Sequence, residues 1–253
     1  MSGKNLRPNS VYISTPINVL VEGYYEQNIT IGEVRTHGDF GLGTFNDLDG
    51  EMVVLDGVVY QVAADGTVGA VADEVLTPFA CVTFYQPETF DEINGEAMMS
   101  REWVAPISPL PYEAFNTLLE RLLPSPNMLY AIRIDGRFSH VRTRSVPKQE
   151  NYRPLVEATK DQVVFDFHDI SGTLSGFYTP PFMPSLNAPG YHLHFISDDR
   201  RRGGHLLSCA VKSARIGMQH IPLLEVALPV TLDYLTADLS RDTRKDLRKA
   251  EQE

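Results

Sequence analysis

Three histidines in the second half of the chain have the spacing of a metal site. His192 and His194 lie two positions apart, and His205 follows them after a polar stretch. In a strand over Tyr191–Ser197, His192 and His194 project from one face, because side chains alternate along a strand. The charged, glycine-ended run Ser197–Gly204 is typical of a turn. We therefore expect His205 to open the returning strand beside His194.

Three imidazoles that converge from a pair of strands are suited to hold a metal ion. Directly opposed residues of two antiparallel strands have Cβ atoms about 4.5–5.5 Å apart. Three protein ligands with an open position are what a catalytic zinc needs, whereas a structural zinc has a fourth protein ligand. We expect zinc because no soft or redox-tuning ligand lies nearby, although imidazole also suits copper and iron. The alternative is a set of ordinary buried histidines, because a His-x-His pair alone is a weak signal.

The composition is that of a globular protein with an acidic balance. Hydrophobic residue types make up 43% of the 253 residues and charged types 22%, which are ordinary values. Lys and Arg number 22 against 33 Asp and Glu, so the formal net charge is −11. This charge argues against a nucleic-acid partner or an anionic membrane, since both require a basic surface. A small anionic substrate would need a local positive centre, such as a metal ion or one particular arginine.

The cysteines and the N-terminal residues favour a cytoplasmic protein. Cys81 and Cys209 lie in apolar runs and are expected to be core residues. The polar residues 1–10 lack the apolar segment of a signal peptide, and no apolar run approaches membrane-spanning length. We therefore expect a cytoplasmic location and no membrane partner.

Apolar periodicity predicts many strands and few helices. Strands bounded by turn residues are expected over residues 51–55, 58–62, 68–71, 79–85, 163–167, 173–178, 191–197, 206–215 and 223–228. Helical spacing is clearest over Glu113–Leu123, and a shorter helical pattern follows Thr15-Pro16. The charged stretch Asp238–Glu253 is weakly helical. The Asp135-Gly136 pair predicts a hairpin turn between two further strands.

These elements predict an α+β fold dominated by mixed and antiparallel β-sheets. The polar stretch 147–154 suggests a boundary between two halves. We expect an N-terminal α+β half over residues 11–150 and a mainly antiparallel β half over residues 151–253. The second half carries the histidines, and therefore the metal site.

Several motifs, taken together, resemble the alpha-acetolactate decarboxylase family. They occur in family order as GDFGLGTFNDLDGE (Gly38–Glu51), VRTRSVP (Val141–Pro147) and GYHLHFISDDRRRGGH (Gly190–His205). Shorter supporting matches are TPFA (Thr77–Ala80), YAIRIDG (Tyr130–Gly136) and GTLSGFYTP (Gly172–Pro180). The resemblance extends from about Val11 to the C-terminus.

The resemblance implies a zinc-dependent lyase. Such an enzyme removes CO2 from (S)-2-acetolactate and gives (R)-acetoin, on the route to butane-2,3-diol. The family's zinc ligands fall here on His192, His194 and His205. The resemblance also implies that the sheets of the two halves join and that the protein is a homodimer.

The other functional positions of the family fall on Glu51, Arg144 and Glu251. Arg144 would bind a substrate carboxylate or an enediolate oxygen through its planar set of donors. Glu51 would deliver the final proton, and Glu251 would share the proton transfer or complete the site when the tail folds over it. Thr44 would line the pocket beside Glu51. Without the family match, a solvated or structural role would be the default for each of them.

The chemistry explains why such a site needs a cation. Loss of CO2 from acetolactate, a β-keto acid, leaves an electron pair that enters the neighbouring carbonyl and forms an enediolate. Zinc held by three neutral imidazoles keeps its full double charge and would stabilise this oxyanion. Two alternatives remain open: another metalloenzyme with a His-x-His…His site, either a zinc hydrolase or a cupin-like iron oxygenase, and a non-catalytic protein that binds a metal or a small molecule.

Overall fold

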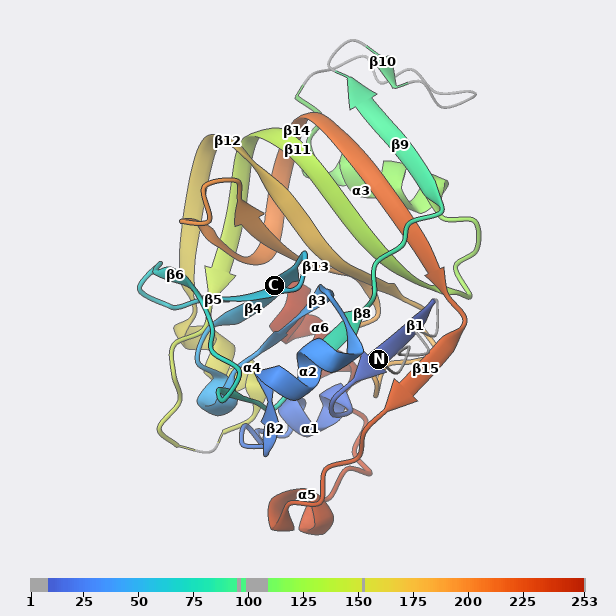
Figure 1. The fold of residues 1–253 in the computed structure, drawn as a ribbon. Helices are drawn as coiled ribbons and strands as arrows, with labels where there is room; N and C mark the ends of the chain where they lie inside the picture. The colour runs from blue at the N-terminus through green and yellow to red at the C-terminus, as the bar shows by residue number, and fades with distance from the viewer. Residues whose placement is uncertain (1–8, 95–96, 99–108, 152, 253) are drawn as a thin grey trace, which may run out of the picture.

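The protein is mostly β-sheet with few helices, as the sequence predicts (Figure 1). The computed structural model describes residues 9–94, 97–98, 109–151 and 153–252. Its first sheet is mixed, because β1 pairs in parallel with β15 and antiparallel with β8. In spatial order its strands are β15 (Leu223–Val226), β1 (Ser10–Ile13), β8 (Ala80–Thr83), β3 (Phe40–Thr44), β4 (Glu51–Leu55), β5 (Val58–Val62) and β6 (Val68–Ala70).

The second sheet is antiparallel and contains the longest strands. In spatial order these are β10 (Ala97–Met98), β9 (Thr89–Asn94), β14 (Gly203–Ile221), β11 (Leu129–Ser145), β12 (Val163–Thr179) and β13 (Gly190–Ser197). β13 also pairs with the beginning of β14, so β14, β11, β12 and β13 form a closed ring. A separate two-stranded sheet joins β2 (Ile29–Thr30) to β7 (Leu76–Thr77).

The described part of the chain also contains six short helices. They are α1 (Ile17–Val21), α2 (Ile31–His37), α3 (Tyr112–Leu122), α4 (Leu155–Ala158), α5 (Leu232–Thr236) and α6 (Arg244–Gln252). α3 confirms the predicted amphipathic helix, and its buried face consists of Phe115, Leu118 and Leu119. Of the helices that the structure describes, none combines the length and apolar character needed to cross a membrane.

The predicted hairpin at Asp135-Gly136 is wrong, because β11 runs through both residues without a turn. Gly136 pairs with Gly172 on one side and with Ala214 on the other. A Cβ atom at Gly136 would lie 2.7 Å from the carbonyl oxygen of Ser213, so the glycine permits close strand pairing. Hydrogen bonds to neighbouring strands on both edges favour the extended chain over the local turn preference.

The expected break between the strands over residues 163–167 and 173–178 is also absent. Both segments belong to β12, which pairs with β11 along nearly its whole length. The long ladders on β11, β12 and β14 therefore replace the shorter hairpins that local patterns suggest.

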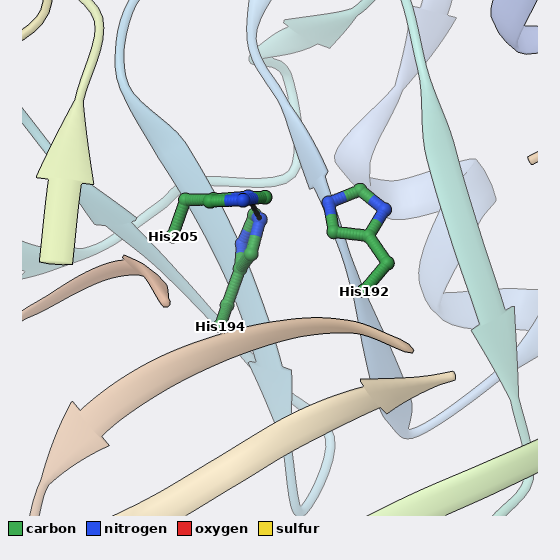
Figure 2. A group of neighbouring side chains, drawn as sticks. All are labelled: His192, His194 and His205. Atoms are coloured by element: carbon green, nitrogen blue, oxygen red, sulfur yellow. Dashed lines mark hydrogen bonds between the residues drawn. The ribbon is translucent and has the colours of Figure 1, made fainter. Parts of the chain in front are cut away.

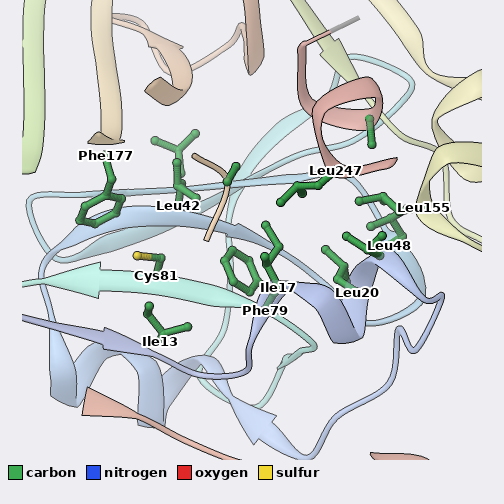
Figure 3. Close-up of a cluster of buried hydrophobic side chains, with 14 of the residues drawn as sticks. Ile13, Ile17, Leu20, Leu42, Leu48, Phe79, Cys81, Leu155, Phe177 and Leu247 are labelled. Atoms are coloured by element: carbon green, nitrogen blue, oxygen red, sulfur yellow. The ribbon is translucent and has the colours of Figure 1, made fainter. Parts of the chain in front are cut away.

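A large apolar core lies against the first sheet and gathers α1, α4 and α6 (Figure 3). α6 contributes Leu247 and Ala250, which are 1% and 3% exposed. They pack in the same cluster as Leu155 of α4 and Ile17 of α1. Because its apolar face is buried there while its basic residues remain exposed, the charged tail forms an amphipathic helix docked on the core rather than a frayed end.

Strand register brings three of the predicted site residues into one row. His194 on β13 pairs with His205 on β14, and His205 pairs in turn with Arg144 on β11. The row lies at the place where the ring of long strands closes. The backbone just before His205 is unusual, because Gly204 has a φ of +129°.

We predict that Gly204→Ala destabilises the fold by about 2 kcal/mol or more, because an L-residue is strained at this φ and the new Cβ is crowded. That Cβ would lie 2.5 Å from the carbonyl oxygen of Arg144. Chemical denaturation measures the free energy of unfolding. The matched control is Gly69→Ala in β6, where an added Cβ meets no atom within 4 Å. Equal losses in the two variants would contradict the prediction.

Candidate active site

The three histidines converge on one face of the β13–β14 pair (Figure 2). Their ligand nitrogens all lie within 4.8 Å of one another, and their ring centroids are 5.0–5.2 Å apart. His192, His194 and His205 are 6%, 1% and 2% exposed. The expectation that His205 opens the returning strand opposite His194 is confirmed.

Backbone carbonyls fix the orientation of two of the rings. The Nδ1–H of His194 donates to the carbonyl oxygen of Met52 at 2.7 Å. The Nε2–H of His205 donates to the carbonyl oxygen of Glu251 at 2.9 Å. A neutral imidazole has one N–H, so the remaining nitrogens, Nε2 of His194 and Nδ1 of His205, both carry lone pairs. These two lone-pair nitrogens face each other at 3.3 Å.

The rings are held in the neutral form. Burial, with a smaller effect from the positive charge of Arg144, lowers the pKa of His192 to about 3. Burial also lowers the pKa of His194 and of His205 well below the ordinary value. A neutral imidazole can bind a metal ion through its free lone pair, whereas a protonated one cannot.

Two carboxylates from distant elements flank the histidines. Glu51 begins β4, and its Oε2 lies 3.5 Å from Nε2 of His194. Glu251 comes from α6, and its Oε2 lies 3.2 Å from Nε2 of His192 and 3.6 Å from Nδ1 of His205. Burial raises the pKa of Glu51 to about 7 even though Arg144 acts in the opposite direction. Burial likewise raises the pKa of Glu251.

Arg144 connects the two carboxylates. Its Nη1 donates to Oε1 of Glu51 at 2.7 Å, and its Nη2 lies 3.7 Å from Oε2 of Glu251. Nη2 also donates to the carbonyl oxygen of Ala250 at 3.1 Å. The last carbonyls of a helix have no partner within the helix, and a positive charge there is favourable. Arg144 and His205 therefore anchor the C-terminal end of α6 directly to the site.

Thr44 lies beside Glu51, as expected. The two residues pair across β3 and β4, and the Thr44 hydroxyl donates to the carbonyl oxygen of Gly50 at 2.6 Å. Thr44, Glu51, Arg144 and Glu251 line one pocket together with His192 and His194. The rest of that pocket is mainly apolar, formed by Ile17, Leu20, Gly43, Leu48, Phe79, Val146 and Leu155.

Two features of this arrangement fit a bound cation. The facing lone pairs of His194 and His205 repel each other unless a cation lies against both. The buried Oε2 of Glu251 accepts no hydrogen bond although it lies beside two imidazole nitrogens. When both glutamates are ionised, Glu51, Glu251 and Arg144 give the site a charge of −1. A divalent ion would make it +1.

Comparison with known proteins identifies the family. The model of the family described as "Alpha-acetolactate decarboxylase" matches residues 11–241. The chain belongs to the alpha-acetolactate decarboxylase family. Its enzyme class is therefore that of a carboxy-lyase. The sequence-based recognition of the family is confirmed.

Relatives in the alpha-acetolactate decarboxylase family match almost the whole chain. The alpha-acetolactate decarboxylase of Methanosarcina mazei is 38% identical over 95% of this chain and 80% of its own length. That of Klebsiella aerogenes is 40% identical, covering 92% of this chain and 85% of its own. The crystal structure of the Bacillus subtilis strain 168 enzyme superposes with a TM-score of 0.88 and is 34% identical, covering 96% of this chain and 100% of that one.

The structure brings every predicted site residue of this alpha-acetolactate decarboxylase family member into one place. These are His192, His194, His205, Glu51, Arg144, Glu251 and Thr44. Sequence reasoning missed the groups that orient the rings. The carbonyl oxygen of Met52 has no signature in sequence, because every residue carries one. The Oδ1 of Asn187 lies 3.5 Å from Nδ1 of His192. Asn187 belongs to a proline-rich loop, and its sequence pattern does not indicate this contact.

The raised pKa of Glu51 predicts a pH-dependent effect of Glu51→Gln on the metal-free protein. Ionisation of Glu51 opposes folding, since its pKa of about 7 in the folded protein exceeds the ordinary 4.5. This penalty is absent at pH values below the ordinary pKa of 4.5. It is complete at pH values above the folded-state pKa of about 7, where it amounts to about 3 kcal/mol. The stability of the variant relative to the parent should therefore rise by that amount across this range.

Chemical denaturation at a series of pH values, with chelator present, measures this difference. Folding lowers the pKa values of the histidines. Their contribution to stability is therefore complete at pH values above the ordinary histidine pKa, and it is lost as the pH falls below that value. This contribution is present in both proteins and largely cancels in the comparison. A difference in stability that stays constant with pH would contradict the prediction.

Proposed function

We propose that this chain converts (S)-2-acetolactate to (R)-acetoin and CO2 with a zinc ion held by His192, His194 and His205. The observation that carries this proposal is the neutral histidine cluster with two buried glutamates and an arginine against it. Family membership supports the reaction, and the nitrogen donor set supports zinc.

Zinc bound there would act as a Lewis acid toward the negative charge that develops as CO2 leaves. The surrounding residues favour an anionic substrate once a divalent ion is present, since the imidazoles are neutral and the site then carries a net positive charge. This local charge provides the attraction that a chain with a formal net charge of −11 does not supply overall.

Glu51 is proposed to supply the final proton. When the bond to the carboxyl carbon breaks, its electron pair enters the neighbouring carbonyl and leaves an enediolate. Glu51 then transfers its proton to the enediolate carbon that has lost the carboxyl group. In the metal-free site, burial raises the pKa of Glu51 to about 7, which favours a carboxyl group that can hold a proton for donation. Since Arg144 holds the carboxyl on one side of the pocket, the proton reaches one face of the carbon and gives a single enantiomer.

Arg144 and Glu251 are proposed to complete the site. Arg144 has N–H groups beyond those that contact Glu51 and Ala250, and these would bind a carboxylate or enediolate oxygen of the substrate. Glu251 would share in the proton transfer or hold the cation beside His192. Thr44 would line the pocket wall next to Glu51. The apolar part of the pocket would contact the methyl groups of acetolactate.

Removal of the metal is predicted to abolish CO2 release, and added zinc is predicted to restore it. Metal analysis of the purified protein, paired with an acetoin assay on racemic acetolactate, measures both. His194→Ala should lose metal and activity together. Bound iron with oxygen consumption would instead favour an oxygenase, and metal binding without CO2 release would favour a non-catalytic protein.

Glu51→Gln is predicted to keep its metal but to lose at least about 100-fold in kcat, because the amide cannot donate the proton. Steady-state kinetics and metal content are measured on the same preparation. The matched control is Glu88→Gln, which changes a carboxylate that also lies beside a histidine, 2.8 Å from His220, but outside the pocket. A fully active Glu51→Gln would remove Glu51 from the mechanism.

Three wider expectations remain part of the proposal. One is the organisation into joined halves over residues 11–150 and 151–253. The others are the homodimer and the cytoplasmic location. The first sheet takes β15 from the second of these halves, and the second sheet takes β9 and β11 from the first. This exchange of strands supports the idea that the halves are joined.

A further inference from the structure

Asn187 lies near the end of the loop between β12 and β13, beside His192 of the histidine cluster. Its relative exposure is 0%, although an amide side chain is costly to bury without partners. The loop is rich in proline, and Ala188, the next residue, is also buried. A polar side chain in such a place must be held by specific hydrogen bonds.

Two hydrogen bonds fix which way the amide points. The backbone N–H of Ala188 donates to Oδ1 of Asn187 at 2.9 Å. On the other side, Nδ2 of Asn187 donates to Sγ of Cys81 at 3.6 Å. A backbone N–H can only be matched by an acceptor, so Oδ1 is identified as the atom on the Ala188 side.

Oδ1 of Asn187 also faces His192, at 3.5 Å from its Nδ1. Because Oδ1 is an acceptor, a hydrogen bond between the two atoms requires the proton on Nδ1 of His192. The other nitrogen, Nε2, is then the lone-pair atom, and it is the one that lies 3.2 Å from Oε2 of Glu251. The same pattern holds for His194 and His205, whose N–H groups donate to backbone carbonyls.

We propose that Asn187 is a positioning residue for the metal site, because its amide oxygen holds His192 in the tautomer that presents Nε2. This inference rests on the proposed metal-dependent function. Of the three acceptors that orient the imidazoles, two are backbone carbonyls and remain under any substitution. Asn187 is the one acceptor of the three that a substitution can remove. Its variants therefore measure how much the orientation of the His192 ring contributes to metal binding.

Loss of this acceptor should weaken metal binding without removing a ligand. Groups that hydrogen-bond to a metal-binding histidine typically contribute about 10–100-fold to metal affinity. Asn187→Ala should therefore weaken binding of zinc and cobalt(II) by about that factor. It should also change the visible absorption spectrum of the cobalt(II) form, which reports ligand geometry. Asn187→Asp keeps an oxygen toward His192 and should recover most of the affinity.

The matched control is Gln219→Ala. Gln219 is also 0% exposed, its Oε1 accepts from the backbone N–H of Gln86 at 2.6 Å, and its Nε2 donates to the carbonyl oxygen of Phe84 at 3.2 Å. It lies near the opposite end of β14 from His205. Gln219→Ala should lower the melting temperature of the metal-free protein but leave metal affinity and the cobalt(II) spectrum unchanged.

The experiment titrates the metal-free full-length variants with zinc and cobalt(II) against a competing chelator of known affinity. A reduced affinity in Asn187→Ala, recovered in Asn187→Asp and absent in Gln219→Ala, supports the positioning role. Unchanged affinity and spectrum in Asn187→Ala overturn it, while the proposed function stands if the parent protein binds zinc and releases CO2. A parent protein that binds neither metal overturns the proposed function as well.

Discussion

The burial of one guanidinium organises the site. Arg144 is 4% exposed, and a charge in such a place is tolerated only with close, well-placed partners. Its partners come from β4 and α6, two elements that lie far from β11 in sequence. The guanidinium thereby joins the mixed sheet, the closed ring of long strands and the last helix at a single point. Removing it would leave the two buried carboxylates without their shared cation.

The same burial controls the protonation of every group around it. Exclusion of water keeps the imidazoles neutral, and it makes Glu51 a much weaker acid than it would be at the surface. Before a cation binds, the site therefore combines free lone pairs with a carboxyl group whose pKa of about 7 lets it retain a proton toward neutral pH. In water, the same side chains would be ionised carboxylates and partly protonated histidines, a set of groups poorly suited to hold a cation and deliver a proton.

The parts of the site that depend on local geometry could be predicted from the sequence. Two-residue alternation places His192 and His194 together, and the turn before His205 returns the chain beside them. The hairpin at Asp135-Gly136 was predicted wrongly because pairing on both edges of β11 outweighs a local turn preference. The burial of Glu251 depends on the docking of α6 through Leu247 and Ala250, and spacing in sequence carries no information about that contact.

The ring of β11, β12, β13 and β14 also affects when the site can form during folding. These strands pair residues that are far apart along the chain, and such topologies fold slowly because long loops must close before their contacts form. The groups that meet at Arg144 come from positions 51, 205 and 251. The three histidines come from one local pair of strands, whereas Glu51, Arg144 and Glu251 come from distant parts of the chain. The complete site therefore depends on closing the longest loops of the fold.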